Sequence, residues 1–170
     1  MLIAPFYIVM PMLMMMRLGI HTIVYPGATE TTLVYNPLLP CVAILSIWIN
    51  DTMAYIVGSW IGKMPFSKIS PKKTWEGTIG GAVLSIGAMG LLGYLLPAAH
   101  QLPVIHWICL AAICSIFGTA GDLLESKLKR MAGLKDSGSF MPGHGGFLDR
   151  FDSLLIALPF AWLYAVLFIS

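Results

Sequence analysis

Five apolar segments, each close to the length of a membrane-spanning helix, most strongly constrain what this chain can fold into. They are residues 2–18, Leu38–Ile61, residues 78–96, Val104 to about Met131, and residues 154–169. A helix needs about 20 apolar residues to cross the hydrocarbon core of a bilayer. No period-two alternation persists along the chain, which argues against a barrel of strands. The sequence therefore predicts an all-α, polytopic membrane helix bundle of about five transmembrane helices, forming a single domain over residues 1–170.

The charged residues are few, and their placement predicts an orientation. They make up 11% of the chain, compared with about 25% of a soluble domain. Nine of the ten Lys and Arg residues fall between the second and third apolar segments, or between the apolar part of the fourth segment, which ends at Asp122, and the fifth segment. Basic loops are retained in the cytoplasm. We therefore expect a cytoplasmic N-terminus, an outer C-terminus and both basic loops on one cytoplasmic face.

Small residues recur four positions apart in two segments, Gly58 with Gly62, and Gly77 with Gly81 and Ser85. In lipid, such stripes let helices approach closely. We expect them to serve helix packing, and they also favour a homodimer.

Two carboxylates lie within or at the end of apolar segments. An ionised Asp51 inside the second segment costs about 3 kcal/mol or more, which favours a functional role over a structural hydrogen bond with Asn50. Asp122 ends the apolar part of the fourth segment and shares a helix face with Glu125 and Lys129. For this second group, the alternative is an ordinary ion pair at a solvated helix end.

The first basic loop, residues 68–77, combines three lysines with hydroxyls and the carboxylate of Glu76. Lysine-rich loops beside a membrane often only set topology or bind anionic lipid. The hydroxyls of Ser70 and Thr74 make phosphate binding a second interpretation, with the loop holding a triphosphate at the mouth of a helix pair.

The second basic segment, residues 126–152, contains five Lys or Arg residues, three aspartates and five glycines. Lys and Arg bind phosphate, carboxylates bind hard metal ions, and glycines let the backbone approach a ligand. His144 is either an acid, base or phosphate ligand, or structural. Asp149 and Asp152 share a face at the start of the fifth segment. The segment predicts metal-assisted phosphate chemistry at a membrane face.

These motifs together resemble the phosphatidate cytidylyltransferases, also called CDP-diacylglycerol synthases. The family signature is matched by Ser126-Lys-Leu-Lys-Arg130, Lys135-Asp136 and His144-Gly-Gly-Phe-Leu-Asp-Arg-Phe-Asp152. Further similar segments are Asn50-Asp-Thr-Met-Ala-Tyr55, Ile69-Ser-Pro-Lys-Lys-Thr-Trp-Glu-Gly77 and Gly118-Thr-Ala-Gly-Asp122. Two positions depart from the family pattern. Met141 stands where the family usually has Leu, Ile or Phe, and Met53 stands where the family has a glycine. The resemblance covers residues 38–170, so the chain is similar to the C-terminal catalytic part of members that have more spans before it.

The resemblance implies a reaction, a metal and a location. CTP and phosphatidate would give CDP-diacylglycerol and pyrophosphate for phospholipid biosynthesis. Asp122 and Asp149 would hold Mg²⁺, with a second, monovalent cation such as K⁺. The protein would lie in a bacterial inner membrane with its active site on the cytoplasmic side, contacting membrane lipid and no nucleic acid.

The resemblance also assigns residues. The catalytic set is Asp122, Lys129, Arg130, His144, Asp149 and Arg150. The substrate-binding set is Asp51, Ser70, Lys72, Lys73, Thr74, Glu76, Lys135, Gly145 and Gly146. The alternatives are a related CTP-dependent enzyme acting on another lipid phosphate or a prenol, and a non-catalytic fragment. A cation transporter would show inverted repeats, and none is evident in the sequence.

Overall fold

The computed structural model describes residues 3–24, 31–67, 70, 73–97, 102–134, 149 and 151–169, with the backbone alone for 3–5, 21–24 and 31–33. Five helices dominate it. They are α1 (Ile3–Leu18), α2 (Leu38–Ile61), α3 (Trp75–Leu95), α4 (Val104–Met131) and α5 (Asp152–Phe168). The predicted all-α membrane fold is confirmed, with one addition: β1 (Ile20–Val24) and β2 (Thr31–Tyr35) form a hairpin between α1 and α2.

Among the described residues, three helices are long and apolar enough to cross a membrane: α2, α3 and α4, with 24, 21 and 28 residues. The other two, α1 and α5, are apolar but shorter. Large apolar side chains cover the outside of the bundle, including Trp60, which is 82% exposed, and Tyr55, which is 78% exposed. Such a surface suits lipid, whereas monomeric soluble proteins rarely expose large apolar patches. The chain is a membrane protein.

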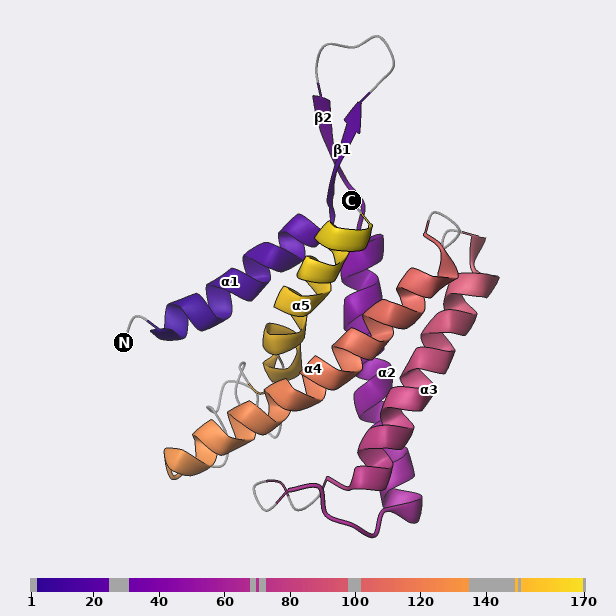
Figure 1. The fold of residues 1–170 in the computed structure, drawn as a ribbon. Coiled ribbons are helices and arrows are strands. Elements are labelled where there is room, and N and C mark those ends of the chain that lie inside the picture. Colours follow the sequence, from indigo (N-terminus) through magenta and orange to yellow (C-terminus); the bar gives the residue numbers. More distant parts are fainter. Residues whose placement is uncertain are drawn as a thin grey trace, which may run out of the picture.

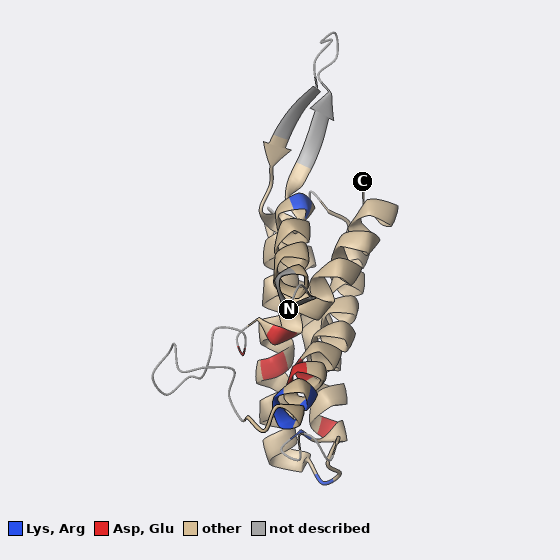
Figure 2. Ribbon diagram, turned by 90° about the vertical axis from the view of Figure 1, so that its left-hand side faces the viewer, with Lys and Arg blue, Asp and Glu red and all other residues tan. Residues whose placement is uncertain are grey.

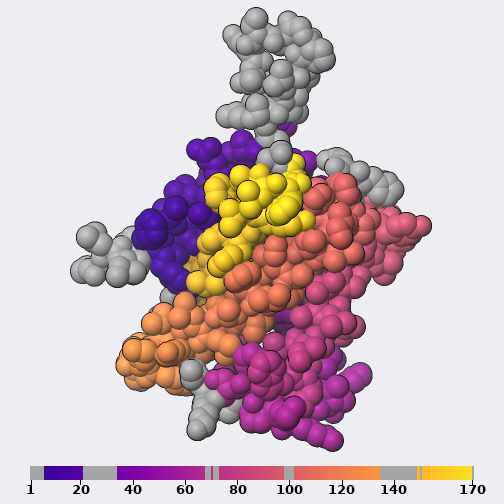
Figure 3. Space-filling view, in the orientation of Figure 1, coloured from indigo at the N-terminus to yellow at the C-terminus, as the bar shows by residue number. Residues whose placement is uncertain are grey.

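The helices form one bundle in which neighbours along the chain pack together. Helix α2 packs on α3, α3 on α4, and α4 on α5, while α1 packs on α5. Figure 3 shows α4 crossing one face of the molecule between α5 and α3. The core between the helices includes Val42, Leu110, Ala111 and Leu158, which are almost completely buried.

A close helix contact joins α2 and α3 and follows the predicted small-residue stripe. A Cβ on Gly77 would lie 2.6 Å from the carbonyl oxygen of Ala54, and one on Gly81 would lie 2.7 Å from the Ala54 amide nitrogen. The Ser85 hydroxyl donates a hydrogen bond of 2.8 Å to the Ser46 carbonyl. The stripe therefore packs two helices of one chain against each other, as expected. A homodimer stays a prediction.

The hairpin stands at one end of the bundle (Figure 1), in a segment that the sequence suggested to be only a loop. Its strands are antiparallel, from Ile20 opposite Tyr35 to Val24 opposite Thr31. Both strands are rich in β-branched residues, which favour extended structure, but each has only five residues. A run this short carries little alternation, and this is why the sequence pattern did not reveal it.

The described Lys and Arg residues lie at the opposite end of the bundle (Figure 2), except for Arg17, which lies in the last turn of α1 near the hairpin. There α3 begins at Trp75, three residues before the predicted start at Thr78. The hydroxyl of Thr74 caps the helix by accepting a hydrogen bond of 3.1 Å from the Gly77 amide. Both basic segments therefore reach the same end of the molecule, as predicted.

Candidate functional site

A cavity of about 560 Å³ opens at the basic end of the bundle. Its lining comes from α2, from α3 and the segment before it, from α4, and from the start of α5. The described residues with polar side chains that line it are Asn50, Asp51, Tyr55, Ser59, Ser70, Lys73, Thr74, Thr78, Thr119, Asp122, Lys129, Asp149, Asp152 and Ser153. This is an unusual concentration of polar groups for a bundle built from apolar helices.

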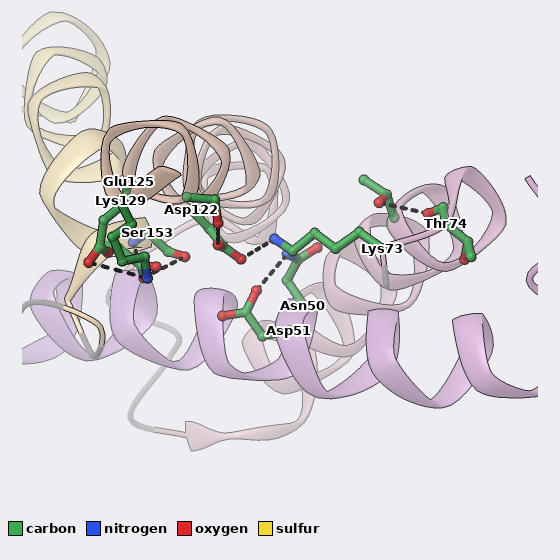
Figure 4. Close-up of polar contacts among 11 residues, drawn as sticks. Asn50, Asp51, Lys73, Thr74, Asp122, Glu125, Lys129 and Ser153 are labelled. Carbon is green, nitrogen blue, oxygen red and sulfur yellow. Dashed lines mark hydrogen bonds and ion pairs between the residues drawn. The ribbon is translucent and has the colours of Figure 1, made fainter. Parts of the chain in front are cut away.

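Asp122 faces the cavity from α4, where the apolar part of the helix ends. Its carboxylate forms an ion pair with the ammonium of Lys73, which extends from the loop before α3 (Figure 4). The Ser126 hydroxyl, one turn further along α4, donates a hydrogen bond of 3.3 Å to the same carboxylate. The ion pair between Lys73 and Asp122 joins residues 49 positions apart in sequence. It brings the first basic loop to the site at α4.

Asp149 precedes α5 and is held by Lys129 of α4. The Lys129 ammonium donates a hydrogen bond of 2.6 Å to Asp149 Oδ1 and lies 3.6 Å from Glu125 Oε1. These three side chains are largely buried, with exposed fractions of 18% for Lys129, 12% for Asp149 and 3% for Glu125. Charge pairs that are shielded from water interact more strongly than surface pairs.

Asp51 faces the same cavity from α2. The side-chain amide of Asn50 donates a hydrogen bond of 3.3 Å to Asp51 Oδ1, so the structural interaction considered for this pair is present. The other polar atom of Asn50, its buried Oδ1, has no hydrogen-bond partner among the described residues. Asn50 therefore offers a free acceptor at the cavity wall.

A second cavity of about 350 Å³ adjoins the first and has a different character. Its apolar lining comes from α1, α2 and the start of α5, and consists of Met15, Ile44, Ile47, Trp48, Phe151 and Leu154. Asp51, Asp149, Asp152 and Ser153 line both cavities. The two spaces thus meet at carboxylates, and together they suit a molecule with an apolar part and a charged part.

The donor chemistry of the first cavity fits a hard cation such as Mg²⁺. Among the described lining residues, aspartates outnumber lysines by four to two, so the lining attracts positive charge. Carboxylate and amide oxygens are the ligands such ions prefer, and the Asn50 Oδ1 lacks a partner. Within the described part of the chain, no three His, Cys, Asp or Glu side chains are already gathered as a metal site. Asp122 and Asp149 are instead each paired with a lysine.

The structure places the other predicted residues unevenly. Ser70 and Thr74 line the cavity beside Lys73, although the Thr74 hydroxyl is engaged in the cap of α3. Glu76 is not in the lining, and its two carboxylate oxygens each lie 3.3 Å from the Met64 amide, from which they accept a hydrogen bond. Arg130 is exposed in the last turn of α4, outside the lining. The remaining predicted residues lie outside the described part of the chain: Lys72, Lys135, His144, Gly145, Gly146 and Arg150.

Several lining residues were not assigned a role from the sequence. The most important is Asp152, which begins α5 and whose Oδ1 accepts a hydrogen bond of 2.6 Å from the Ser153 amide. Its place at the end of the signature, three residues after Asp149, is a signal that could have found it. Thr78 lies one turn after Thr74, so its position on the same helix face could also have been noted. Thr119 and Ser153 carry no comparable signal.

A carboxylate-rich cavity at one end of an apolar helix bundle, with an apolar cavity beside it, defines a membrane protein with a site for a charged, amphipathic ligand. The chain belongs to the Cytidylyltransferase family, whose profile matches residues 2–168. This match extends over all five helices.

Curated relatives are similar over most of the chain. A phosphatidate cytidylyltransferase of Bacillus subtilis is 43% identical over 129 residues, which are 74% of this chain and 46% of that protein. One of Synechocystis sp. is 42% identical over 134 residues, 76% of this chain and 44% of that protein. One of Staphylococcus haemolyticus is 45% identical over 118 residues, 69% of this chain and 45% of that protein. The chain therefore spans about half the length of the curated relatives it matches.

Proposed function

We propose that this protein transfers a cytidylyl group from CTP to phosphatidate, giving CDP-diacylglycerol and pyrophosphate. The observation that carries the proposal is the cavity in which Asp122 and Asp149, from separate segments, pair with Lys73 and Lys129 at the basic end of a membrane bundle. Membership of the family and the names of the relatives support CTP as the donor and phosphatidate as the acceptor. Phospholipid biosynthesis would be the process served.

Asp122 and Asp149 are the residues we propose to hold Mg²⁺, and a monovalent cation such as K⁺ is proposed beside it. The bound Mg²⁺ would polarise the phosphoryl oxygens and offset their charge. The excess of aspartates over lysines in the described lining supports a cation requirement, since a polyanion alone would be repelled by these carboxylates.

In the proposed reaction, a phosphate oxygen of phosphatidate forms a bond to the α-phosphorus of CTP. The bond from that phosphorus to the bridging oxygen breaks, and pyrophosphate leaves with the electron pair. The nucleophile is already ionised, so the site needs to bring two anions together rather than remove a proton. Lys73 and Lys129 would contact the phosphates from opposite sides of the cavity, and the fixed charges stabilise the charge that develops on the transferred group. Arg130, Arg150, Lys72, Lys135 and His144 are proposed to assist.

The apolar cavity gives the proposal a place for the lipid. A diacylglycerol portion in contact with Ile47, Trp48 and Leu154 would leave its phosphate near Asp149 and Ser153, where the two cavities meet. Access from the side, between helices, would let the headgroup reach the site without leaving the membrane. We place this site on the cytoplasmic side of a bacterial inner membrane, because the basic segments lie at the same end of the bundle.

The test is an assay of membranes containing the full chain with labelled CTP, phosphatidate and Mg²⁺, with and without K⁺. We expect labelled CDP-diacylglycerol, and we expect Asp149→Asn to reduce its formation at least 100-fold, as losses at residues that stabilise transition-state charge do. Equal expression of the variant is checked by size-exclusion chromatography.

Each alternative predicts a different result. Label that enters another lipid phosphate or a prenol in preference to phosphatidate would assign a related CTP-dependent reaction. A folded chain that transfers no label to any lipid, while a longer relative does so under the same conditions, would contradict the proposal for these 170 residues.

A further inference from the structure

Glu125 is a buried acidic residue that lies behind the wall of the larger cavity. It is 2% exposed and is not one of the residues that line the cavity. Neither of its carboxylate oxygens accepts a hydrogen bond from a donor group of the described residues, and the side chains of Asp149 and Asp152 lie beside it. Burying a carboxylate without hydrogen bonds costs free energy unless a nearby positive charge compensates it. The cation that compensates Glu125 therefore indicates what Glu125 does.

The close approach of α4 and α5 encloses Glu125. On α4, one turn before Glu125, a Cβ on Gly121 would lie only 2.6 Å from the backbone oxygen of Asp152. The start of α5 therefore rests directly on α4 at this level. Glu125 lies on the next turn of α4 and is buried.

The compensating charge is Lys129, one turn further along α4. Its ammonium lies 3.6 Å from Glu125 Oε1 and donates a hydrogen bond of 2.6 Å to Asp149 Oδ1 (Figure 4). Lys129 thus stands between a carboxylate that lines the cavity and one that does not. In this structure it is bonded to the first and only attracted to the second.

We propose that Glu125 is a positioning residue, which takes the Lys129 ammonium from Asp149 when Asp149 binds the metal ion. This inference rests on the proposed function. The distance from Lys129 to Glu125 needs to shorten only from 3.6 Å to the roughly 2.8 Å of a charge-assisted hydrogen bond. Asp149 is then available to the cation, and both Lys129 and the buried carboxylate keep a partner of opposite charge.

Removing the charge of Glu125 has opposite effects on the two ligands. Lys129 would lose its attraction to Glu125 and keep its hydrogen bond to Asp149 and a weaker attraction to Asp152, so it would compete harder with a metal ion for Asp149. The site would also be less negative, which weakens the binding of a divalent cation but favours the binding of a polyanion such as CTP. General damage to the structure would instead weaken the binding of both Mg²⁺ and CTP. A positioning role of Glu125 can therefore be distinguished from structural damage.

The experiment measures binding of labelled CTP to the purified full chain in detergent, without phosphatidate so that no turnover occurs, as Mg²⁺ is varied. For Glu125→Gln, we expect the Mg²⁺ concentration at half-saturation to rise about tenfold, a typical coupling between charged residues in contact. We expect the affinity for CTP without Mg²⁺ to be unchanged or higher. Ser115→Ala is the matched control, because Ser115 is also buried on α4 with an unpartnered side chain, and it should behave as the wild type.

An unchanged Mg²⁺ midpoint in folded Glu125→Gln overturns the inference, and so does a parallel loss of Mg²⁺ and CTP affinity. Where Glu125→Gln does not fold, Glu125→Asp carries the test. It keeps the charge but withdraws it from Lys129, so a smaller rise of the midpoint is expected and an unchanged midpoint is contradictory. Wild-type chain that binds no CTP at any Mg²⁺ concentration overturns the proposed function itself, together with this inference.

Discussion

Each lysine in the described lining of the larger cavity is paired with an aspartate from another segment. Lys73 contacts Asp122, and Lys129 contacts Asp149. Charges of both signs are thereby held together before a ligand arrives. An incoming cation can then replace a lysine at an aspartate, and an incoming phosphate can replace an aspartate at a lysine. Binding by exchange of partners avoids leaving a charge unpaired in a partly buried site.

We predict that Lys73→Gln lowers kcat/KM for CTP by about tenfold or more, because a hydrogen bond to a charged group contributes about 1.5–3 kcal/mol. Steady-state rates in membranes measure the effect. Lys63→Gln is the matched control: Lys63 lies in the same connection between α2 and α3 but is exposed and does not line the cavity. Its rate should stay within twofold of the wild type. An equal loss in both variants would assign the effect to the total charge of the loop.

The sequence identified the members of the site better than their partners. Asp51 and Asp122 stand out because carboxylates are rare in apolar helices, Asp149 stands out as part of the charged segment 126–152, and all three line the cavity. The pairing of Lys73 with Asp122 could not be predicted, since it depends on how α3 and α4 pack. For Glu76, the sequence suggested a ligand contact, because this carboxylate lies in a lysine-rich loop. In the fold, Glu76 instead accepts a hydrogen bond from the Met64 amide.

At the scale of helices, the contact between α2 and α3 lies at the wall of the cavity. Asp51 lines it from α2 and Thr78 lines it from α3, and the two helices touch at Ala54 and Gly81. A side chain at Gly81 would push the helices apart, because there is no space for it beside the Ala54 backbone.

We predict that Gly81→Ala destabilises the protein by about 1–3 kcal/mol, the usual effect of overfilling a packed interface. Its thermal midpoint in detergent should fall, and its transferase activity should fall with it. Gly87→Ala on the same helix is the control, because a Cβ at Gly87 meets nothing within 4 Å. Its midpoint should be unchanged or slightly higher, since alanine is the better helix former. Equal midpoints for the two variants would argue against a close contact at Gly81.

Helix positions were largely predictable, whereas helix ends and the hairpin were not. The apolar runs located all five helices, because in lipid the length of such a run nearly determines a helix. The first turns of α3 and α5 are polar and fell outside the predicted segments, yet Asp152 lies in one of them. Their helical state depends on local caps such as Thr74 and on tertiary contacts. The hairpin strands are too short for a periodic signal.

At the scale of the whole molecule, the two ends of the bundle differ in character. The described Asp and Glu residues, and the described Lys and Arg residues other than Arg17, lie away from the hairpin (Figures 1 and 2), and the residues that line the cavity belong to the same part of the bundle. The signal for this polarity was in the distribution of Lys and Arg along the sequence. The way in which the segments converge on one cavity was not, because it follows from the packing of α4 between α3 and α5.

We predict that the end with the cavity faces the cytoplasm and the hairpin faces the other side of the membrane. Single cysteines in a variant without Cys41, Cys109 and Cys114 test this with a membrane-impermeant maleimide on intact cells. A cysteine at Val34, which is exposed in β2, should react in intact cells, because it lies on the outer side. A cysteine at Lys63 should react only after the membrane is permeabilised, because basic residues are retained inside. The reverse pattern would place the site outside, away from cytoplasmic CTP, and would contradict both the orientation and the proposed donor. Reaction of both cysteines in intact cells would show that α2, which connects them, does not cross the membrane.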